Sequence, residues 1–317
     1  MTRVVLALGG NAIAPAGTAG TAPEQTAAIR TAMDQVAHLL TAVDLELVIT
    51  HGNGPQVGNL LIKNELARDV VPPMPLDWCV AQTQATIGFT VANTLGDALR
   101  RAGIERPVIP LVSRVLVAAD DPAFSAPHKP IGPHLSDEEQ LAERRAEGIE
   151  FVATSRGWRR VVASPEPLVS LDLETVRHLL AHGAVVVANG GGGVPTIRAA
   201  DGSLHGVEAV IDKDLAGAML AIELTADRLA ILTDVAGVAI AFGTPEERWL
   251  QEVSVDELRG HAATGAFGVG SMGPKVEAAC RFVEATSGTA VIARLEDALE
   301  AIEGRIGTRV VPAVGAA

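Results

Sequence analysis

Three lysines occupy sequence surroundings that are unusual for a solvated charge. Lys129 lies in PHKPIGP, Lys213 lies in AVIDKDLAGAML between Asp212 and Asp214, and Lys275 follows GSMGP. Most lysines are exposed surface charges. Lys213 and Lys275 instead stand among small and apolar residues near expected strand or loop ends, so we interpret them as cations that neutralise a bound anion. Lys129 is expected in a rigid loop that three prolines stiffen.

Glycine-rich turns follow the expected strands. The run VVLAL ends in GGN, LVIT ends in HGNG, AVVVA ends in NGGGG, and AILT ends in Asp234. Glycine-rich runs are often flexible linkers, but a linker does not explain the recurrence. Ligands of open α/β sheets bind beyond the carboxyl ends of the strands. The three ends stripped of side chains (GGN, HGNG and NGGGG) therefore predict one shared site, where backbone N–H groups meet an anion that comes too close for side chains.

Composition limits the classes of protein to consider. Of 317 residues, 48% are hydrophobic and 20% are charged, which indicates a folded globular protein. The net charge of −13 disfavours a nucleic-acid partner. Cys79 and Cys280 show neither zinc-site spacing nor a disulfide framework. The first apolar run, residues 4–8, is too short for a secretory signal, and no run reaches the length of a membrane helix. We therefore expect a cytoplasmic protein.

Short β-branched runs alternate with helical periodicity along the chain. Strands are expected at 3–8, 46–50, 184–188, 228–233 and 289–293. A helix is expected after Pro23, and another is expected over 172–183, with Asp172 as its N-cap and Gly183 at its end. Apolar strands that alternate with amphipathic helices predict parallel βαβ units, with helices on both faces of an open sheet.

The familiar catalytic fingerprints do not fit. Residues 52–58, GNGPQVG, are one residue too long for the dinucleotide pattern, and residues 268–275, GVGSMGPK, depart from the Walker A pattern. No nucleophile elbow occurs. His51 is interpreted as a structural hydrogen-bonding residue rather than a catalyst. A glycine-lined anion site with several lysines and no evident general base suits phosphoryl transfer to an acceptor that is already an anion.

Nine segments together resemble carbamate kinase, a group of the wider amino acid kinase superfamily. They occur in the order and at the spacing of that group, from residue 4 to about 311: LGGNAI (8–13), HGNGPQVG (51–58), DDPAF (120–124), KPIGP (129–133), GWRRVV (157–162), ANGGGGVP (188–195), GVEAVIDKD (206–214), ILTDV (231–235) and GSMGPKVEAA (270–279).

The resemblance implies a three-layer α/β/α sandwich around a mainly parallel open sheet of about eight strands, in one amino-acid-kinase-like domain over 1–317. Within it, a carbamate- and phosphoryl-binding lobe would span 1–205, with a protruding lid subdomain over about 114–165. A nucleotide-binding lobe would span 206–317. The resemblance also implies a homodimer.

The implied reaction is ATP plus carbamate giving ADP plus carbamoyl phosphate, with Mg²⁺ carried by the nucleotide. Lys213 and Lys275 would neutralise the phosphates, Asp214 would orient both lysines, and Lys129 would reach down from the lid. The carbamate and phosphoryl cradle would consist of Gly9, Gly10, Asn11, Gly52 and Asn53, with Gly191 and Gly192 of the tetraglycine as its floor. The nucleotide would contact Lys213 and Lys275 and a pocket lined by Thr233, Asp234, Ala239, Gly270, Ser271 and Met272. Arg159 and Arg160 would help the lid to close.

The sequence departs from this group in places and leaves alternatives open. Ala236 and Ala239 stand where the group commonly has an acid and a tyrosine, which bears on nucleotide affinity. One alternative is a kinase of the same fold that acts on another small carboxylate. Another is a catalytically silent nucleotide-sensing protein, which the presence of Lys213, Asp214 and Lys275 disfavours.

Overall fold

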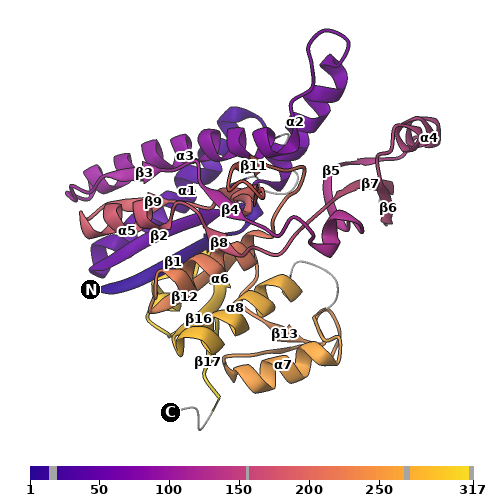
Figure 1. Ribbon diagram of the computed structural model, residues 1–317. Helices are drawn as coiled ribbons and strands as arrows, with labels where there is room; N and C mark the ends of the chain where they lie inside the picture. Colours follow the sequence, from indigo (N-terminus) through magenta and orange to yellow (C-terminus); the bar gives the residue numbers. More distant parts are fainter. Residues whose placement is uncertain (14–19, 155–156, 268–271, 314–317) are drawn as a thin grey trace.

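The computed structural model describes residues 1–13, 20–154, 157–267 and 272–313. Its centre is an eight-stranded sheet in which only β16 and β17 are antiparallel neighbours (Figure 1). In spatial order the strands are β15 (Glu252–Ser254), β17 (Thr308–Val311), β16 (Thr289–Arg294), β12 (Arg228–Thr233), β1 (Thr2–Leu8), β2 (Leu45–His51), β9 (Val185–Val187) and β3 (Val108–Pro110).

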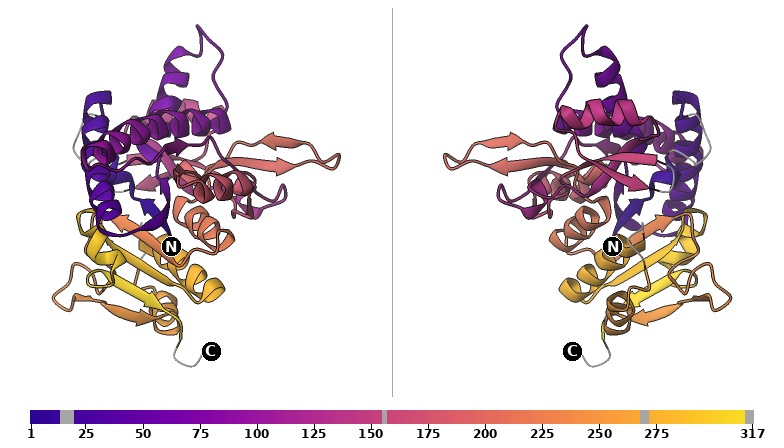
Figure 2. Two further views of the ribbon diagram at one scale, coloured as in Figure 1. Left: turned by 90° about the vertical axis from the view of Figure 1, so that its left-hand side faces the viewer. Right: turned by 90° about the vertical axis from the view of Figure 1, so that its right-hand side faces the viewer.

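Both faces of this sheet are buried, as continuous apolar strands require. In β1, Val5 and Ala7 join one apolar core, while Val4, Leu6 and Leu8 join the other. The first core also takes residues from α5 (Leu173–Ala181), α6 (Lys213–Glu223), α7 (Val255–Ala263) and α8 (Met272–Thr286). The second takes residues from α1 (Ala22–Ala42), α3 (Leu76–Arg101) and α9 (Ala298–Ile302). The expected three-layer α/β/α fold is confirmed (Figures 1 and 2).

Smaller sheets surround the central one. A three-stranded sheet of β5 (Lys129–Leu135), β7 (Gly157–Val162) and β6 (Phe151–Thr154) projects from the body together with α4 (Glu138–Ala146), on the right of Figure 1. We call these four elements the lid. A second sheet contains β11 (Leu204–Gly206), β10 (Val194–Arg198), β4 (Arg114–Leu116) and β8 (Val169–Ser170). The first strand of the expected 114–165 subdomain, β4, thus pairs outside the lid, and the proposed division into lobes stays a prediction.

Several local expectations can be compared with the structure. The strand expected at 228–233 has those bounds, and the helix expected after Pro23 begins at Ala22, where Thr21 and Glu24 form a capping box. Asp172 stands at the N-cap of α5, but its carboxylate accepts hydrogen bonds from the backbone and guanidinium of Arg114 instead of capping the helix.

The expectation of a loop around Lys129 was wrong. Residues Lys129–Leu135 form a strand, in which Pro130 pairs with Val161. This strand is at the edge of the three-stranded sheet, where a proline removes no ladder hydrogen bond. Lys129 is therefore held by strand pairing rather than by a stiff loop.

The remaining elements complete the chain. α2 (Gly54–Ala67) projects beside the lid, and β13 (Ala239–Ile240) pairs with β14 (Arg248–Trp249). Short 3₁₀ turns occur at Gly10–Ala12, Pro122–Phe124, Gly190–Gly192 and Leu295–Asp297. Within the described ranges, no helix combines the length and the apolar character that crossing a membrane requires.

Candidate active site

The glycine-rich turns converge on one cavity at the carboxyl ends of β1, β2 and β9. It has a volume of about 260 Å³ and we call it the lysine pocket. Gly10, Gly52, Asn53 and Gly191 line it. The turns are separated widely in sequence, but parallel strands bring their carboxyl ends to one edge of the sheet. The structure thus places the three glycine-rich turns around one cavity, as predicted.

All three singled-out lysines also line the lysine pocket, and Asp214 joins two of them. The Asp214 carboxylate is 2.5 Å from Lys213 Nζ and 3.3 Å from Lys275 Nζ. Asp214 is only 3% exposed and Lys275 only 5%. A buried charge is costly unless it is paired, so the three side chains stabilise one another as a unit.

Lys129 reaches the same pocket from β5 of the lid. Its Nζ donates to Asp212 Oδ2 at 3.0 Å. Asp212 is the N-cap residue of α6, and its other oxygen, Oδ1, accepts from the backbone N–H of Asp214 at 2.9 Å. Sequence reasoning missed Asp212 as a site residue. Its position before a helix signals a cap, but nothing in the sequence places it against a lysine of the lid.

Burial and neighbouring charges shift the pKa values of two groups in the lysine pocket, Lys275 and Asp212. Burial lowers the pKa of the Lys275 ammonium, the nearby Lys213 charge lowers it further, and Asp214 only partly offsets both. For Asp212, burial raises the pKa, but the charges of Lys129 and Lys213 outweigh burial and leave it below its usual range. The pocket also has an excess of positive charge, because the three ammonium groups of Lys129, Lys213 and Lys275 face only the two carboxylates of Asp212 and Asp214.

Helix ends add to this positive field. Gly54 and Pro55 at the start of α2, Lys213 at the start of α6, and Pro274 and Lys275 in the first turn of α8 all line the lysine pocket. A helix N-terminus carries a partial positive charge that favours anions, although at the start of α6 the Asp212 carboxylate already accepts from the N–H groups of Asp214 and Leu215. Three such ends and three lysines make the pocket suited to phosphate or carboxylate groups.

The glycines at the site mainly make room for other protein groups. A Cβ on Gly52 would lie 3.1 Å from Lys213 Cδ, and one on Gly191 would lie 2.2 Å from Asn53 Nδ2. On Gly192 it would lie 2.5 Å from the carbonyl oxygen of Ile211. Gly191 and Gly192 also have positive φ angles of 65° and 95°, which side chains disfavour.

The expected role of the tetraglycine therefore needs correction. Gly190 packs on the His51 ring and Gly193 on Val115, so the spaces that their missing side chains leave are filled by protein. Gly191 lines the lysine pocket, whereas Gly192 is buried against Ile211 and does not line it. Among the predicted cradle residues, Gly9 packs against the end of β12, and the backbone of Asn11 lies in the turn after Gly10.

His51 is a neutral structural residue, as predicted. Burial lowers its pKa from 6.5 to about 4. Its Nδ1 lies 2.9 Å from the carbonyl oxygen of Gly52, and a neutral ring donates its proton there. The ring thus fixes the turn that carries Gly52 and Asn53.

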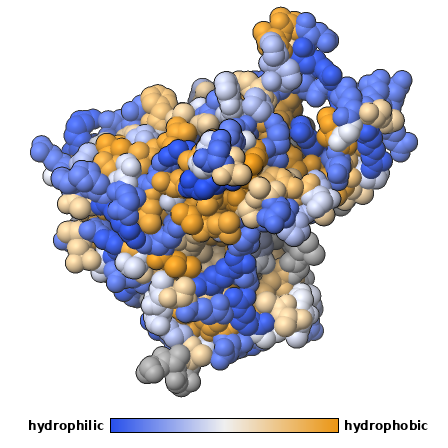
Figure 3. All heavy atoms as spheres, viewed as in Figure 1, coloured by the Kyte–Doolittle hydropathy of each residue, from blue (hydrophilic) through white to orange (hydrophobic). Residues whose placement is uncertain are grey.

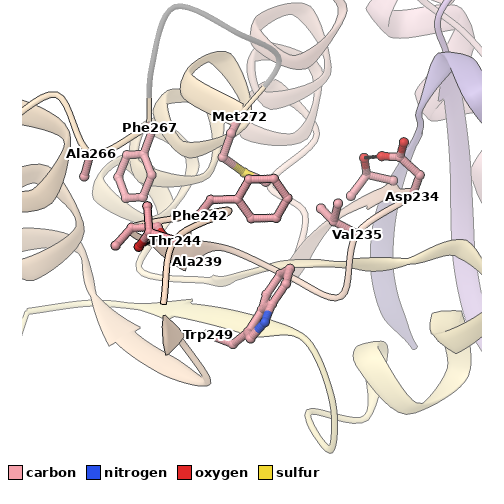
Figure 4. A pocket seen from close by; sticks show the side chains of 12 residues that line it. Asp234, Val235, Ala239, Phe242, Thr244, Trp249, Ala266, Phe267 and Met272 are labelled. Atoms are coloured by element: carbon pink, nitrogen blue, oxygen red, sulfur yellow. Dashed lines mark hydrogen bonds between the residues drawn. The ribbon is translucent and has the colours of Figure 1, made fainter. Parts of the chain in front are cut away.

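A second cavity, of about 460 Å³, adjoins the first turn of α8. We call it the aromatic pocket (Figure 4). It is lined by Thr233, Asp234, Val235, Gly237, Ala239, Ala241, Phe242, Thr244, Trp249, Ala266, Phe267 and Met272. Four of the predicted nucleotide-pocket residues are therefore here, namely Thr233, Asp234, Ala239 and Met272. Gly270 and Ser271 lie outside the described residues.

The aromatic pocket has two unlike ends. In Figure 4, Asp234 lies beside the strands of the central sheet, where Thr233 Oγ1 donates to it at 3.0 Å. Phe242 and Trp249 lie farther from the sheet, between Val235 and Phe267, with their ring centroids 6.1 Å apart in an edge-to-face arrangement. Sequence reasoning missed these two rings, because Phe242 lies between β13 and β14, Trp249 lies in β14, and neither stands in a recognisable motif.

The first turn of α8 connects the two cavities. Met272 lines the aromatic pocket, and Lys275 lines the lysine pocket. A ligand with an apolar ring at one end and phosphates at the other matches this arrangement. Comparison with known proteins gives the same indication, because the model of the amino acid kinase family matches residues 2–294.

The chain belongs to the amino acid kinase family. It is 48% identical to a carbamate kinase of Thermococcus kodakarensis over 98% of this chain and 99% of that one, and 42% identical to carbamate kinase 3 of Staphylococcus aureus over 97% and 99%. Among solved structures, carbamate kinase from Giardia lamblia bound to AMP-PNP superposes with a TM-score of 0.92 at 36% identity, covering 98% of this chain and 99% of that chain. The resemblance to carbamate kinases is confirmed, and the protein is a phosphotransferase.

Substitutions at two glycines of this kinase should distinguish a glycine needed for packing from one needed for contact with the ligand. Gly192→Ala adds a methyl group against the Ile211 carbonyl at a positive φ, and we expect it to lower the free energy of unfolding by about 2 kcal/mol or more. A Cβ on Gly10 would meet no protein atom within 4 Å. Gly10→Ala should therefore stay within about 0.5 kcal/mol of the parent and still lose phosphotransfer activity. Denaturant unfolding and an activity assay of both variants test this; a fully active Gly10→Ala enzyme would contradict close ligand approach.

His51 should make this kinase acid-sensitive. Between pH 6.5 and about 4 the unfolded histidine binds a proton that the folded one excludes, so stability falls as pH falls through this window. The loss from this one group is about 3 kcal/mol. In His51→Asn that loss should vanish, although stability at pH 7 can change. The exposed His38→Asn is the control. The free energy of unfolding of each variant, measured at pH 7 and at pH 4, tests this. If it falls between these pH values by the same amount in His51→Asn as in the parent, the assignment is refuted.

Proposed function

We propose that this kinase transfers a phosphoryl group reversibly between ATP and carbamate, giving ADP and carbamoyl phosphate. The observation that carries the proposal is the convergence of Lys129, Lys213 and Lys275 on a glycine-lined cavity of only about 260 Å³. A cavity of this size suits a very small acceptor. The names of the relatives, at 42% to 48% identity over nearly the whole chain, support the same acceptor.

The lysine pocket supplies what this reaction requires. Carbamate is an anion, so its oxygen attacks the γ-phosphorus of ATP without a general base, and the bond from that phosphorus to the bridging oxygen of ADP breaks in line. Negative charge is spread over the transferred group in the transition state, and positioned cations stabilise it. Lys213 and Lys275, fixed by Asp214, would neutralise the phosphates, and Lys129 would contact the transferred group from the lid.

The aromatic pocket is the proposed site of the nucleotide base. Its apolar end offers the rings of Phe242 and Trp249, which suit stacking against a flat base. Its other end, with Thr233 and Asp234, points toward the central sheet. A nucleotide bound in this direction would extend its phosphates past the first turn of α8 into the lysine pocket. Phe242 and Trp249 would then take the place of the tyrosine that Ala239 lacks.

Mg²⁺ would arrive with the nucleotide. In the described part of the chain, no group of three or more His, Cys, Asp or Glu side chains is placed to hold a metal ion. The carboxylates of Asp212 and Asp214 are engaged with lysines. Mg²⁺ commonly keeps several waters and binds phosphate oxygens, so these donors fit an ion held mainly by the substrate. When bound, it would neutralise phosphate charge.

The alternatives fit the site less well. A kinase for a larger carboxylate would need more room or a guanidinium to hold the acceptor, and the described cations that line the lysine pocket are lysines. A silent nucleotide sensor would not need to hold Lys213 and Lys275 on one buried carboxylate.

The expected homodimer stays a prediction. Apolar side chains gather in the middle of the face shown in Figure 3, around β4, β8 and β11 of Figure 1. The exposed residues Val169 of β8 and Leu204 of β11 belong to these strands. Such exposed apolar surface is typical of a protein contact, and it supports self-association.

The direct test is formation of ATP. The purified protein should make ATP from ADP and carbamoyl phosphate when Mg²⁺ is present, and acetyl phosphate should be a poorer donor because its methyl group cannot replace the hydrogen-bonding amino group. A luminescent ATP assay measures both rates under identical conditions. Much faster use of another acyl phosphate would reject carbamate as the acceptor.

Lysine substitutions test the assignment of roles. Lys213→Ala and Lys275→Ala should each lower kcat by about 10²–10³, the loss expected when one preorganised transition-state donor is removed. Lys275→Met, which keeps most of the side-chain volume, controls for the buried site, and the exposed Lys63→Ala controls for general effects of losing a charge. Steady-state kinetics with thermal unfolding of each variant give the answer. A folded Lys275→Met enzyme with parental kcat would exclude the role.

A further inference from the structure

Asp212 connects two parts of the site that are far apart in sequence. One carboxylate oxygen pairs with Lys129 Nζ of the lid, and the other accepts from the first backbone N–H groups of α6. The helix that Asp212 caps begins with Lys213 and Asp214. A single side chain thus ties the lid lysine to the helix that supplies the other charges.

The charge balance of the lysine pocket requires such a partner. Asp214 is already shared by Lys213 and Lys275. Lys129 enters the same pocket as a third cation, and repulsion from the other two would turn its flexible side chain outward. Asp212 offsets this repulsion. The Lys129 and Asp212 side chains are 24% and 23% exposed, so water screens their attraction only in part.

Contacts other than the Lys129–Asp212 ion pair hold the lid against α2. A Cβ on Gly58 of α2 would lie 2.7 Å from Gly132 Cα of β5, so these two elements touch backbone to backbone. Ile131 and Val162 of the lid also belong to an apolar cluster with Val57 of α2. The lid strand therefore stays seated without the ion pair, and the carboxylate of Asp212 acts on the position of the Lys129 ammonium.

We infer that Asp212 is a positioning residue that holds Lys129 over the reacting phosphoryl group. This inference rests on the proposed function for its catalytic consequence, but the placement of Lys129 can be measured separately. A mere N-cap role is the competing explanation. Asparagine caps helices as well as aspartate does, so Asp212→Asn keeps the cap and removes the charge that holds Lys129.

The placement is tested without any activity assay. The chain has four lysines, at positions 63, 129, 213 and 275. Brief acylation with an amine-reactive ester followed by mass spectrometry should label Lys129 about 2- to 5-fold faster in Asp212→Asn than in the parent, the factor that corresponds to a partly exposed ion pair. Exposed Lys63 should be labelled equally in both. Equal labelling of Lys129 would overturn the inference even if the protein makes ATP as proposed.

The catalytic consequence is tested by a double-mutant cycle in ATP synthesis. Asp212→Asn should lower kcat about 10- to 100-fold, as expected for a misplaced catalytic group, while KM for ADP changes less than about 3-fold, as expected of an interaction made mainly in the transition state. Lys129→Met should lose at least as much, and the double variant should be no slower than Lys129→Met alone. Ser254→Ala, which removes the cap of α7, should lower stability and leave kcat unchanged. Losses that multiply in the double variant, or parental kcat in Asp212→Asn, would overturn the inference.

Discussion

The site depends on one buried carboxylate that must be neutralised. Asp214 is 3% exposed, and an unpaired charge at that depth would destabilise the fold by several kcal/mol. Its two partners come from the start of α6 and the first turn of α8, so the ion pairs fix how these helices meet at the edge of the sheet. A Cβ at position 52 would lie 3.1 Å from Lys213 Cδ and crowd that side chain, so glycine there leaves room for it. Charge, helix placement and the glycine turn are therefore parts of one constraint.

The glycines serve this constraint through packing more than through flexibility. His51 and Asn53 stand against Gly190 and Gly191 at distances that a Cβ would forbid. The buried His51 ring contacts the Gly52 carbonyl, and Asn53 Nδ2 donates to Thr83 at 2.9 Å, so the turn is held from both sides. A rigid turn keeps its backbone groups aimed at the pocket before a ligand arrives, which is what preorganised electrostatic stabilisation requires.

The fold and the meeting of the strand-end turns could be predicted from the sequence, because apolar strand runs and the glycines that follow them are local patterns. The strand over 228–233 was predicted with its bounds for that reason. The partner of Lys129 could not be predicted, since Asp212 lies 83 residues away in the sequence. The residues around Asp212 indicate only a helix cap. The roles of the four adjacent glycines were equally hidden, because they pack against three distant segments, which contribute His51 and Asn53, Val115, and Ile211.

The two pockets place different demands on the chain. The described walls of the lysine pocket combine buried charges and backbone turns that contact one another, so a change at one residue leaves another group unpaired. The aromatic pocket presents mainly apolar side chains, which replace one another with small changes in volume. Ala239, which stands where the carbamate kinase pattern commonly has a tyrosine, lines the aromatic pocket, whereas Lys213, Asp214 and Lys275, which match that pattern, line the lysine pocket. Binding that depends on apolar contact area can lose one side chain and keep the rest of its contacts, whereas binding that depends on paired charges leaves a charge without its partner when one member is lost.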